Sequence, residues 1–172
     1  MMNELINRLH RSDYKKIIWL FAISETLHNL EEAIWLPEWS GIAAIKHLTV
    51  GAFEFRFAVT SITIIFLGIT YYFSKYENRS SKYLMGGSLV IALFNVFVPH
   101  LIGAIYTGQY FPGVVTGVLL NIPVIVYLLR RGLAEGFFQI KTLVLGGVGL
   151  AIIVLPLLQL FFVLGRALAG II

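Results

Sequence analysis

Long apolar segments recur along the whole chain, and short polar or basic stretches separate them. A helix needs about 20 mostly apolar residues to cross a hydrocarbon core roughly 30 Å thick. Backbone groups inside a bilayer must also find their hydrogen bonds within the protein, so each long apolar run predicts a helix. Five runs qualify: 14–36, 47–73, 83–106, 112–129 and 137–164. The expected fold class is all-α, a polytopic membrane helix bundle with about five transmembrane helices.

Composition supports this fold class and excludes several kinds of function. The chain is 58% hydrophobic and 13% charged, with a mean hydropathy of +0.85. It contains no cysteine, which excludes disulfides, thiolate metal sites, iron–sulfur clusters and a cysteine nucleophile. The net charge of +4 does not predict nucleic-acid binding, because the basic residues lie beside the apolar runs. The expected partner is the lipid bilayer, with no nucleic acid.

Basic residues are distributed unevenly between the two sides of the membrane that this map defines. Ten of them share the side of the N-terminus: Arg8, Arg11, Lys15, Lys16, Lys75, Arg79, Lys82, Arg130, Arg131 and Lys141. Only Lys46 and Arg166 fall in segments on the other side. We therefore expect a multi-pass protein of the cell (cytoplasmic) membrane with a cytoplasmic N-terminus. Residues 1–13 are expected to form an interfacial segment, and residues 14–172 a single five-helix transmembrane domain.

The first apolar run contains several charged side chains. Glu25, His28 and Glu32 are three and four residues apart and share one helix face, with Glu31 beside them. A charged side chain at such depth costs a few kcal/mol, so several kept together predict a functional site rather than packing. Counting 1.5 Å per residue from the N-terminal side places the group in the outer half of the bilayer.

Polar residues on three other helices reach comparable depths, namely Glu54, His100, Thr116 and Asn121. Imidazole and carboxylate groups together form the ligand set of zinc, iron or manganese. The candidate metal ligands, which are also the candidate catalytic residues, are His28, Glu31, Glu32, Glu54 and His100. The candidate substrate-positioning residues are Asn95, Thr116 and Asn121.

Some of these residues also have simpler interpretations. Membrane-buried asparagines commonly form hydrogen bonds between helices, which is the simpler interpretation of Asn95 and Asn121. Glu54 can pair with Arg56, although residues two apart point to different helix faces. The glycine-rich stretch at residues 146–149 predicts a helix-packing surface.

His28-Asn29-Leu30-Glu31-Glu32 is similar to the signature of the HXXEE family of small bacterial membrane proteins. The chain resembles this family further along as well, in Asn95 followed by His100 and in the segment Tyr110-Phe111-Pro112-Gly113-Val114-Val115-Thr116. The spacing between Asn95 and His100 is one residue longer than in the family pattern. The resemblance extends from the first to the fourth apolar run and supports the site. The family has no assigned biochemical function, so the resemblance leaves the reaction open.

These patterns predict an intramembrane metal-dependent enzyme. We expect a hydrolase that acts on a lipid or isoprenoid-like substrate at the His/Glu cluster, with zinc, iron or manganese as cofactor. One alternative is a cation- or proton-coupled transporter, or a small-molecule-binding membrane subunit. Another is a metal-free lipid isomerase that uses Glu and His as acid and base. The scarcity of polar side chains in the inner half of the spans favours a one-sided pocket over a transport path.

Overall fold

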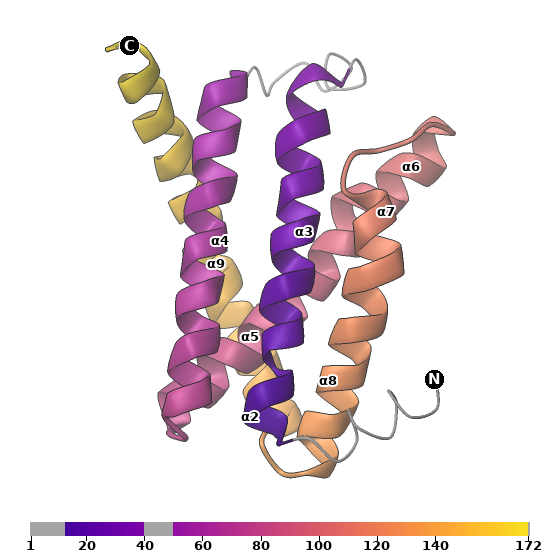
Figure 1. Cartoon of the computed structure of the whole chain (residues 1–172), viewed down its shortest axis with the longest axis vertical. Coiled ribbons are helices and arrows are strands. Elements are labelled where there is room, and N and C mark those ends of the chain that lie inside the picture. Colours follow the sequence, from indigo (N-terminus) through magenta and orange to yellow (C-terminus); the bar gives the residue numbers. More distant parts are fainter. Residues whose placement is uncertain (1–12, 40–49, 172) are drawn as a thin grey trace.

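The computed structural model describes residues 13–39 and 50–171, and all the regular structure in these ranges is helical (Figure 1). The first membrane segment consists of α2 (Tyr14–Ile17) and α3 (Trp19–Trp35), followed by the 3-10 turn η1 (Leu36–Glu38). The other elements are α4 (Ala52–Lys75), α5 (Arg79–Asn95), η3 (Val96–Leu101), α6 (Ile102–Thr107), α7 (Val114–Thr116), η4 (Gly117–Asn121), α8 (Ile122–Ala134) and α9 (Ile140–Ala169). The predicted all-α class is confirmed.

Four helical segments are long and apolar enough to cross a membrane: Ala52–Lys75, Arg79–Thr107, Val114–Ala134 and Ile140–Ala169. The segment formed by α2 and α3 runs beside them, but three glutamates lower its hydropathy. The protein is therefore a multi-pass membrane protein with four to five spanning helices. Its last helix extends to Ala169, five residues beyond the predicted end at residue 164. The interfacial segment expected at residues 1–13 lies, apart from Asp13, outside the described residues.

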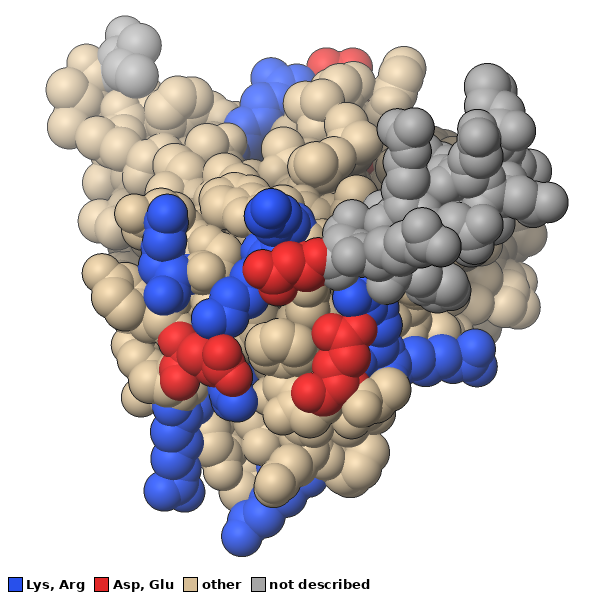
Figure 2. Space-filling view, turned by 60° about the horizontal axis from the view of Figure 1, so that its bottom comes forward, with Lys and Arg blue, Asp and Glu red and all other residues tan. Residues whose placement is uncertain are grey.

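The bundle has one basic end, where α2, α5 and α9 start and where α4 and α8 finish. Figure 2 is turned to bring this end forward and shows Lys and Arg side chains around it, with acidic ones between them. The described basic residues of this end are Lys15, Lys16, Lys75, Arg79, Lys82, Arg130, Arg131 and Lys141. At the opposite end the described basic residues are Arg56 and Arg166. The helix directions thus gather the predicted inner-side residues on one end of the molecule.

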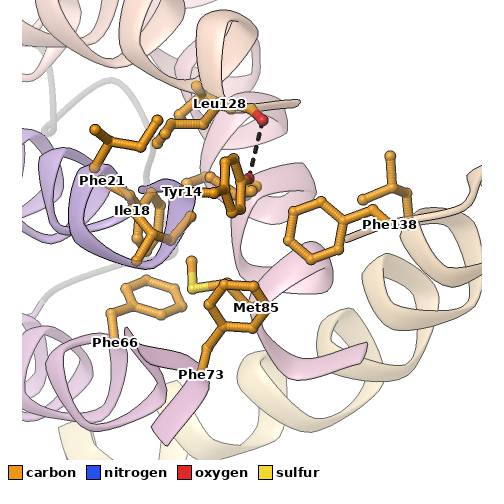
Figure 3. Close-up of a cluster of buried hydrophobic side chains, with 13 residues drawn as sticks. Tyr14, Ile18, Phe21, Phe66, Phe73, Met85, Leu128 and Phe138 are labelled. Atoms are coloured by element: carbon orange, nitrogen blue, oxygen red, sulfur yellow. Dashed lines mark hydrogen bonds between the residues drawn. The ribbon is translucent and has the colours of Figure 1, made fainter. Parts of the chain in front are cut away.

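Buried hydrophobic side chains fill the half of the bundle nearest the basic end (Figure 3). Phe21, Phe73 and Met85 in this cluster are completely buried. The hydroxyl of Tyr14 donates a hydrogen bond to the backbone carbonyl of Leu128 at 2.9 Å, so the one polar atom of this aromatic side chain is satisfied. These contacts join α2, α4, α5, α8 and the start of α9, and they position the first helix within the bundle.

Glycines allow α5 and α9 to approach closely. A Cβ atom at Gly87 would lie 2.4 Å from the carbonyl oxygen of Gly146, and one at Gly146 would lie 2.4 Å from that of Tyr83. Any side chain at either position would therefore force the two backbones apart. A Cβ at Gly149 would have no neighbour within 4 Å. The predicted packing role of the 146–149 stretch thus applies to its first residues and not to its last.

The third membrane segment, predicted as one helix over residues 83–106, is interrupted in the structure. After α5 the chain forms the π-helical turn η3, in which Val98 has the non-helical angles φ −129° and ψ 110°. Pro99 follows through a cis peptide bond. Proline lacks a backbone N–H and its ring clashes with the preceding turn, which explains why the helix breaks here. Helix α6 then ends at Thr107, with Gly108 in the left-handed conformation after it, and a short loop leads back to α7.

Candidate functional site

The acidic face of α3 packs against the third and fourth membrane segments. His28 is completely buried, and Glu31 and Glu32 are each 9% exposed. Asn29, in the same stretch, instead contacts α4, where its amide donates a hydrogen bond to Thr63 Oγ1 at 2.8 Å. The polar residues of α3 therefore divide between a structural contact with α4 and a cluster beside η3 and α7.

Asn95 and His100 reach this cluster from the interruption in the third segment. On a straight α-helix, residues five apart lie about 140° apart around the axis. The broken turn η3 brings both to the same side, and the amide nitrogen of Asn95 lies 3.2 Å from His100 Nε2. The same nitrogen lies 3.3 Å from His28 Nε2. The longer spacing between Asn95 and His100 is therefore compatible with one shared site.

The loop between α6 and α7 closes against the two histidines. The carbonyl of Pro112 accepts a hydrogen bond from His100 Nδ1 at 2.7 Å. Gly113 has a φ of +89°, and a Cβ atom there would lie 2.7 Å from His100 Nδ1 and 3.0 Å from His28 Cε1. Glycine is therefore required at this position both by backbone conformation and by space.

Glu31 accepts three hydrogen bonds from the segment that follows α6. Tyr110 OH donates to its Oε1 at 2.5 Å, and Thr116 donates to its Oε2 through the backbone N–H at 2.8 Å and the hydroxyl at 2.5 Å. Burial and the bond to Glu31 raise the pKa of Tyr110, so this loop phenol stays a donor. Because the hydroxyl proton of Thr116 goes to Glu31, its oxygen accepts from His28 Nδ1, 3.1 Å away. Glu31 thus orients His28 through Thr116.

Both histidine rings carry a proton on Nδ1, as assigned from their hydrogen-bond partners. His28 Nδ1 donates to Thr116, and His100 Nδ1 donates to a backbone carbonyl. In neutral rings each Nε2 then presents a lone pair, and the Asn95 amide can donate one N–H to each. Glu32 Oε1, also an acceptor, lies 2.7 Å from His100 Nε2 and 3.6 Å from His28 Nε2. Two acceptors in such close contact require a positive centre, either a proton or a metal ion.

The donor set of this cluster is compatible with a divalent transition metal. One ligand atom from each of His28, Glu32 and His100 lies within 4.8 Å of the other two. Two histidines and one glutamate are the protein ligands in one class of catalytic zinc site, which keeps a further position for water or substrate. Histidine ligands commonly donate their second ring N–H to an oxygen atom, as both rings do here.

Comparisons with known proteins agree with the motif at the centre of this site. A family model described as "Protein of unknown function with HXXEE motif" matches residues 19–128. The chain belongs to this family. It is similar to the uncharacterized protein YrkK of Bacillus subtilis (strain 168), with 36% identity over 146 residues that cover 84% of this chain and 92% of YrkK. No solved structure matches the chain.

The residues of the HXXEE motif differ in what they contact. His28 and Glu32, four residues apart, bring their side chains to the space shared with His100. Glu31 is bound by Tyr110 and Thr116 instead. The two glutamates therefore occupy different environments. Glu32 contacts the imidazoles directly, whereas Glu31 contacts the residues of the 110–116 segment.

The structure places Glu54, an expected ligand of this HXXEE protein, away from the cluster. Its carboxylate accepts hydrogen bonds from Arg166 Nε at 3.0 Å and Nη2 at 3.1 Å, which joins α4 to the end of α9. It also accepts the backbone N–H of Gly51 at 3.3 Å, at the start of α4. Arg56 donates to the backbone carbonyl of Ala33 at 3.0 Å. Glu54 is thus a helix-capping and ion-pairing residue in this structure.

Asn121 also lies apart from the histidines. Its amide donates to Glu25 Oε2 at 2.8 Å, one helical turn closer to the basic end than His28. Both side chains are buried, and Asn121 Oδ1 has no hydrogen-bond partner among the described residues. Of the predicted positioning residues, Asn95 and Thr116 contact the cluster directly, while Asn121 and Glu25 form a neighbouring polar pair.

Three features that contact the cluster could not be predicted from residue type alone. They are the Tyr110 hydroxyl, the Pro112 carbonyl and the absence of a side chain at Gly113. All three lie in the segment from Tyr110 to Thr116, which resembles the HXXEE family pattern. That resemblance is the signal that marks this segment, because an exposed loop tyrosine and a backbone carbonyl are common without function.

Proposed function

We propose that this protein is an intramembrane metal-dependent enzyme, a hydrolase that acts on a lipid or isoprenoid-like substrate. The observation that carries the proposal is the convergence of three acceptor atoms, His28 Nε2, His100 Nε2 and Glu32 Oε1. A divalent cation satisfies all three at once, whereas Asn95 provides donors only for the two imidazoles. Zinc, iron and manganese suit this mixture of nitrogen and oxygen ligands better than calcium or magnesium.

The residues around the ligands have distinct tasks in this proposal. A bound metal of this kind polarises a carbonyl or phosphoryl oxygen and lowers the pKa of bound water. Thr116 and the Pro112 carbonyl fix the rings of His28 and His100, so that both Nε2 lone pairs point inward. Glu32 faces the imidazoles through Oε1, so its second carboxylate oxygen would be the group that takes up a proton during hydrolysis.

A substrate that enters from the bilayer fits the surroundings of the cluster. Glu32 keeps 11% of its side chain exposed, whereas the two histidines are closed off. Apolar side chains on α3 and at the start of α6, which follows η3, are exposed on the outside of the bundle: Leu27, Leu30 and Ile102 at 43%, 51% and 55% exposure. We place the basic end on the cytoplasmic side of the cell membrane, so the cluster faces the outer half of the bilayer.

Acid–base catalysis without metal is a second candidate that one observation favours. The 2.7 Å between Glu32 Oε1 and His100 Nε2 is the length of a charge-assisted hydrogen bond. With a proton shared between them, Glu32 and His100 could act as base and acid in the migration of a lipid double bond. Transport receives less support, because a cluster of buried apolar side chains fills the half of the bundle near the basic end.

Metal content separates these candidates. Full-length protein purified in detergent is exchanged into metal-free buffer, and zinc, iron and manganese are measured by elemental analysis. We expect about one metal ion per chain in the wild type, and its loss in Glu32→Gln and in His100→Ala. Glu54→Gln is the matched control, because it removes an equivalent carboxylate that lies outside the cluster.

Three outcomes would contradict the proposal of a metal-dependent hydrolase. A folded wild type that retains no metal after purification and reloading would leave the acid–base candidate. Equal metal loss in Glu54→Gln and Glu32→Gln would show that the cluster is not the binding site. An activity that survives chelation would favour the isomerase type of reaction over hydrolysis.

A further inference from the structure

A second part of the molecule has the features of a binding site, and it lies at the opposite end from the His/Glu cluster. A hollow of about 490 Å³ opens at the basic end, between the starts of α5 and α9. Its polar and basic wall consists of Asn78, Arg79, Lys82, Gln139, Lys141 and Thr142. The contact between α5 and α9 at Gly87 and Gly146 keeps these two helix starts side by side.

The charge of this hollow is positive. Three cationic side chains line it, against one carboxylate, that of Glu77. Glu77 is already paired with Lys15 at 3.2 Å and with Lys82 at 3.3 Å. Within the described part of the chain, Arg79 and Lys141 have no acidic partner, and the Arg79 guanidinium lies over the ring of Tyr83 at 5.5 Å. Two cations therefore remain available to an external anion.

Helix direction adds to this positive potential. Both α5 and α9 begin at the hollow, and a helix N-terminus carries a partial positive charge with free N–H groups. Asn78 caps α5 by accepting the backbone N–H of Ser81, whereas Gln139 makes no side-chain cap at the start of α9. The first turn of α9 thus offers backbone donors beside Lys141.

A comparable hollow nearby shows what distinguishes this one. It measures about 500 Å³ and is lined by Lys15, Lys16 and Lys75 together with Trp19 and Tyr71. Lys75 is the last residue of α4, so the helix contributes its partial negative end there. The start of α2 also reaches the second hollow, but the Asp13 carboxylate caps it by accepting the backbone N–H of Lys15 at 3.0 Å. Charge from side chains is similar in the two hollows, but only the first has the N-terminus of a long helix without a side-chain cap.

We propose that the hollow between α5 and α9 binds the phosphate group of an anionic phospholipid. The phosphate would lie between Arg79 and Lys141, with the N-terminus of α9 as a further donor. The basic end of a membrane bundle lies at headgroup level, where such lipids are the abundant anions, and basic pockets between membrane helices suit their headgroups. This site is independent of the reaction at the His/Glu cluster.

Lipid titration followed by native mass spectrometry tests the assignment on the full-length, detergent-solubilised protein. Dioleoyl phosphatidylglycerol and dioleoyl phosphatidylcholine are added in parallel, and the apparent Kd of the first bound lipid is measured. Wild type should bind phosphatidylglycerol in clear preference. Arg79→Gln with Lys141→Gln should weaken this binding about 30-fold, since each cation near an anionic surface contributes a factor of about five.

Two matched variants make the test specific. Lys16→Gln with Arg130→Gln removes the same charge from exposed positions at the same end and should leave the Kd nearly unchanged. Arg79→Lys with Lys141→Arg keeps both charges and should retain binding. Equal weakening by both charge-removing pairs, or no preference for phosphatidylglycerol in the wild type, would overturn the proposal. Displacement of the lipid by inorganic phosphate at equal concentration would assign the hollow to soluble phosphate instead.

Discussion

The two halves of the bundle are built from different kinds of contact. Near the basic end, Phe73, Met85 and Leu89 are completely buried and belong to one cluster of hydrophobic side chains. Toward the other end, His28 and His100 are equally buried, but each ring nitrogen faces a defined polar partner. Apolar packing depends on volume and shape, whereas a polar cluster depends on where single donors and acceptors lie.

The difference between apolar packing and a polar cluster indicates which half can bind a ligand or catalyse a reaction. In the apolar half, the buried hydroxyls of Tyr14 and Thr70 donate to backbone carbonyls, so packing there does not call for a ligand. The polar half contains more acceptors than donors around Glu32, so it is complete only when a positive centre is present. Substitutions in the two halves should therefore affect different properties of the protein.

The largest effect on stability should come from the apolar half. We expect Phe73→Ala to lower the free energy of unfolding by roughly 3–5 kcal/mol, because it leaves a cavity among completely buried side chains. Metal content should not change. Phe94→Ala is the control, since this side chain is 64% exposed toward the surroundings of the bundle. Detergent-based unfolding measurements and elemental analysis check both; metal loss in Phe73→Ala would show that the halves are not separate.

A somewhat smaller effect is expected at Gly113, where the polar half has no spare space. Gly113→Ala should cost roughly 2–4 kcal/mol, from a strained positive φ and from contact with the His100 ring, and it should also remove the metal. Gly108→Ala shares the positive φ, +62°, but its Cβ would have no neighbour within 4 Å. It should therefore show only the backbone part of the cost. Equal metal retention in both variants would contradict the close fit at Gly113.

The third prediction concerns Glu31, the glutamate that does not contact the imidazoles directly. Glu31→Gln should weaken metal binding about 10- to 100-fold without abolishing it, because Glu31 orients His28 through Thr116 rather than binding the ion. Tyr110→Phe should have a smaller effect in the same direction, since it removes one of the three bonds to Glu31. Competition titration with a metal chelator measures both. Glu38→Gln, at an exposed position on η1, is the control, and an equal effect there would contradict the proposed role.

The smallest effect is expected at the basic end, outside both halves. Hydrogen bonds from Lys15 and Lys82 lower the pKa of Glu77. A carboxyl group with a lowered pKa contributes stability above its unfolded value of 4.5, and this contribution is lost as pH falls through the folded pKa. Because the side chain is 47% exposed, solvent limits the contribution to about 0.2–1 kcal/mol. The stability difference between wild type and Glu77→Gln should be present at pH 7 and disappear well below pH 4.5.

The sequence predicts the helices well because hydropathy depends on local composition. Apolar runs and their basic flanks locate the membrane segments and the end at which the basic residues gather. Counting depth along the helices places His28, Glu32, His100 and Thr116 at one level of the bundle, together with Glu54 and Asn121. The structure brings the first four together and adds Asn95 to them. Depth along a helix can be counted from the sequence.

The direction in which a helix face points within the bundle cannot be read from the sequence in the same way. Glu54 lies at a suitable depth, but the packing of α4 against α9 turns it toward Arg166. The break at Val98 and the return of the loop at Gly113 also depend on contacts between distant segments. The roles of Tyr110 and the Pro112 carbonyl follow from that loop, so they become visible only in the folded chain.

The position of α9 in the bundle has a consequence for the order of events during synthesis. Every residue of the His/Glu cluster lies between His28 and Thr116, and α9 packs against α5 and α4 rather than against the cluster. Domains form from the N-terminus onward as the chain leaves the ribosome. The cluster can therefore assemble before the last helix is made, whereas the close packing at Gly87 and the Glu54–Arg166 ion pair form only after α9 has been synthesised.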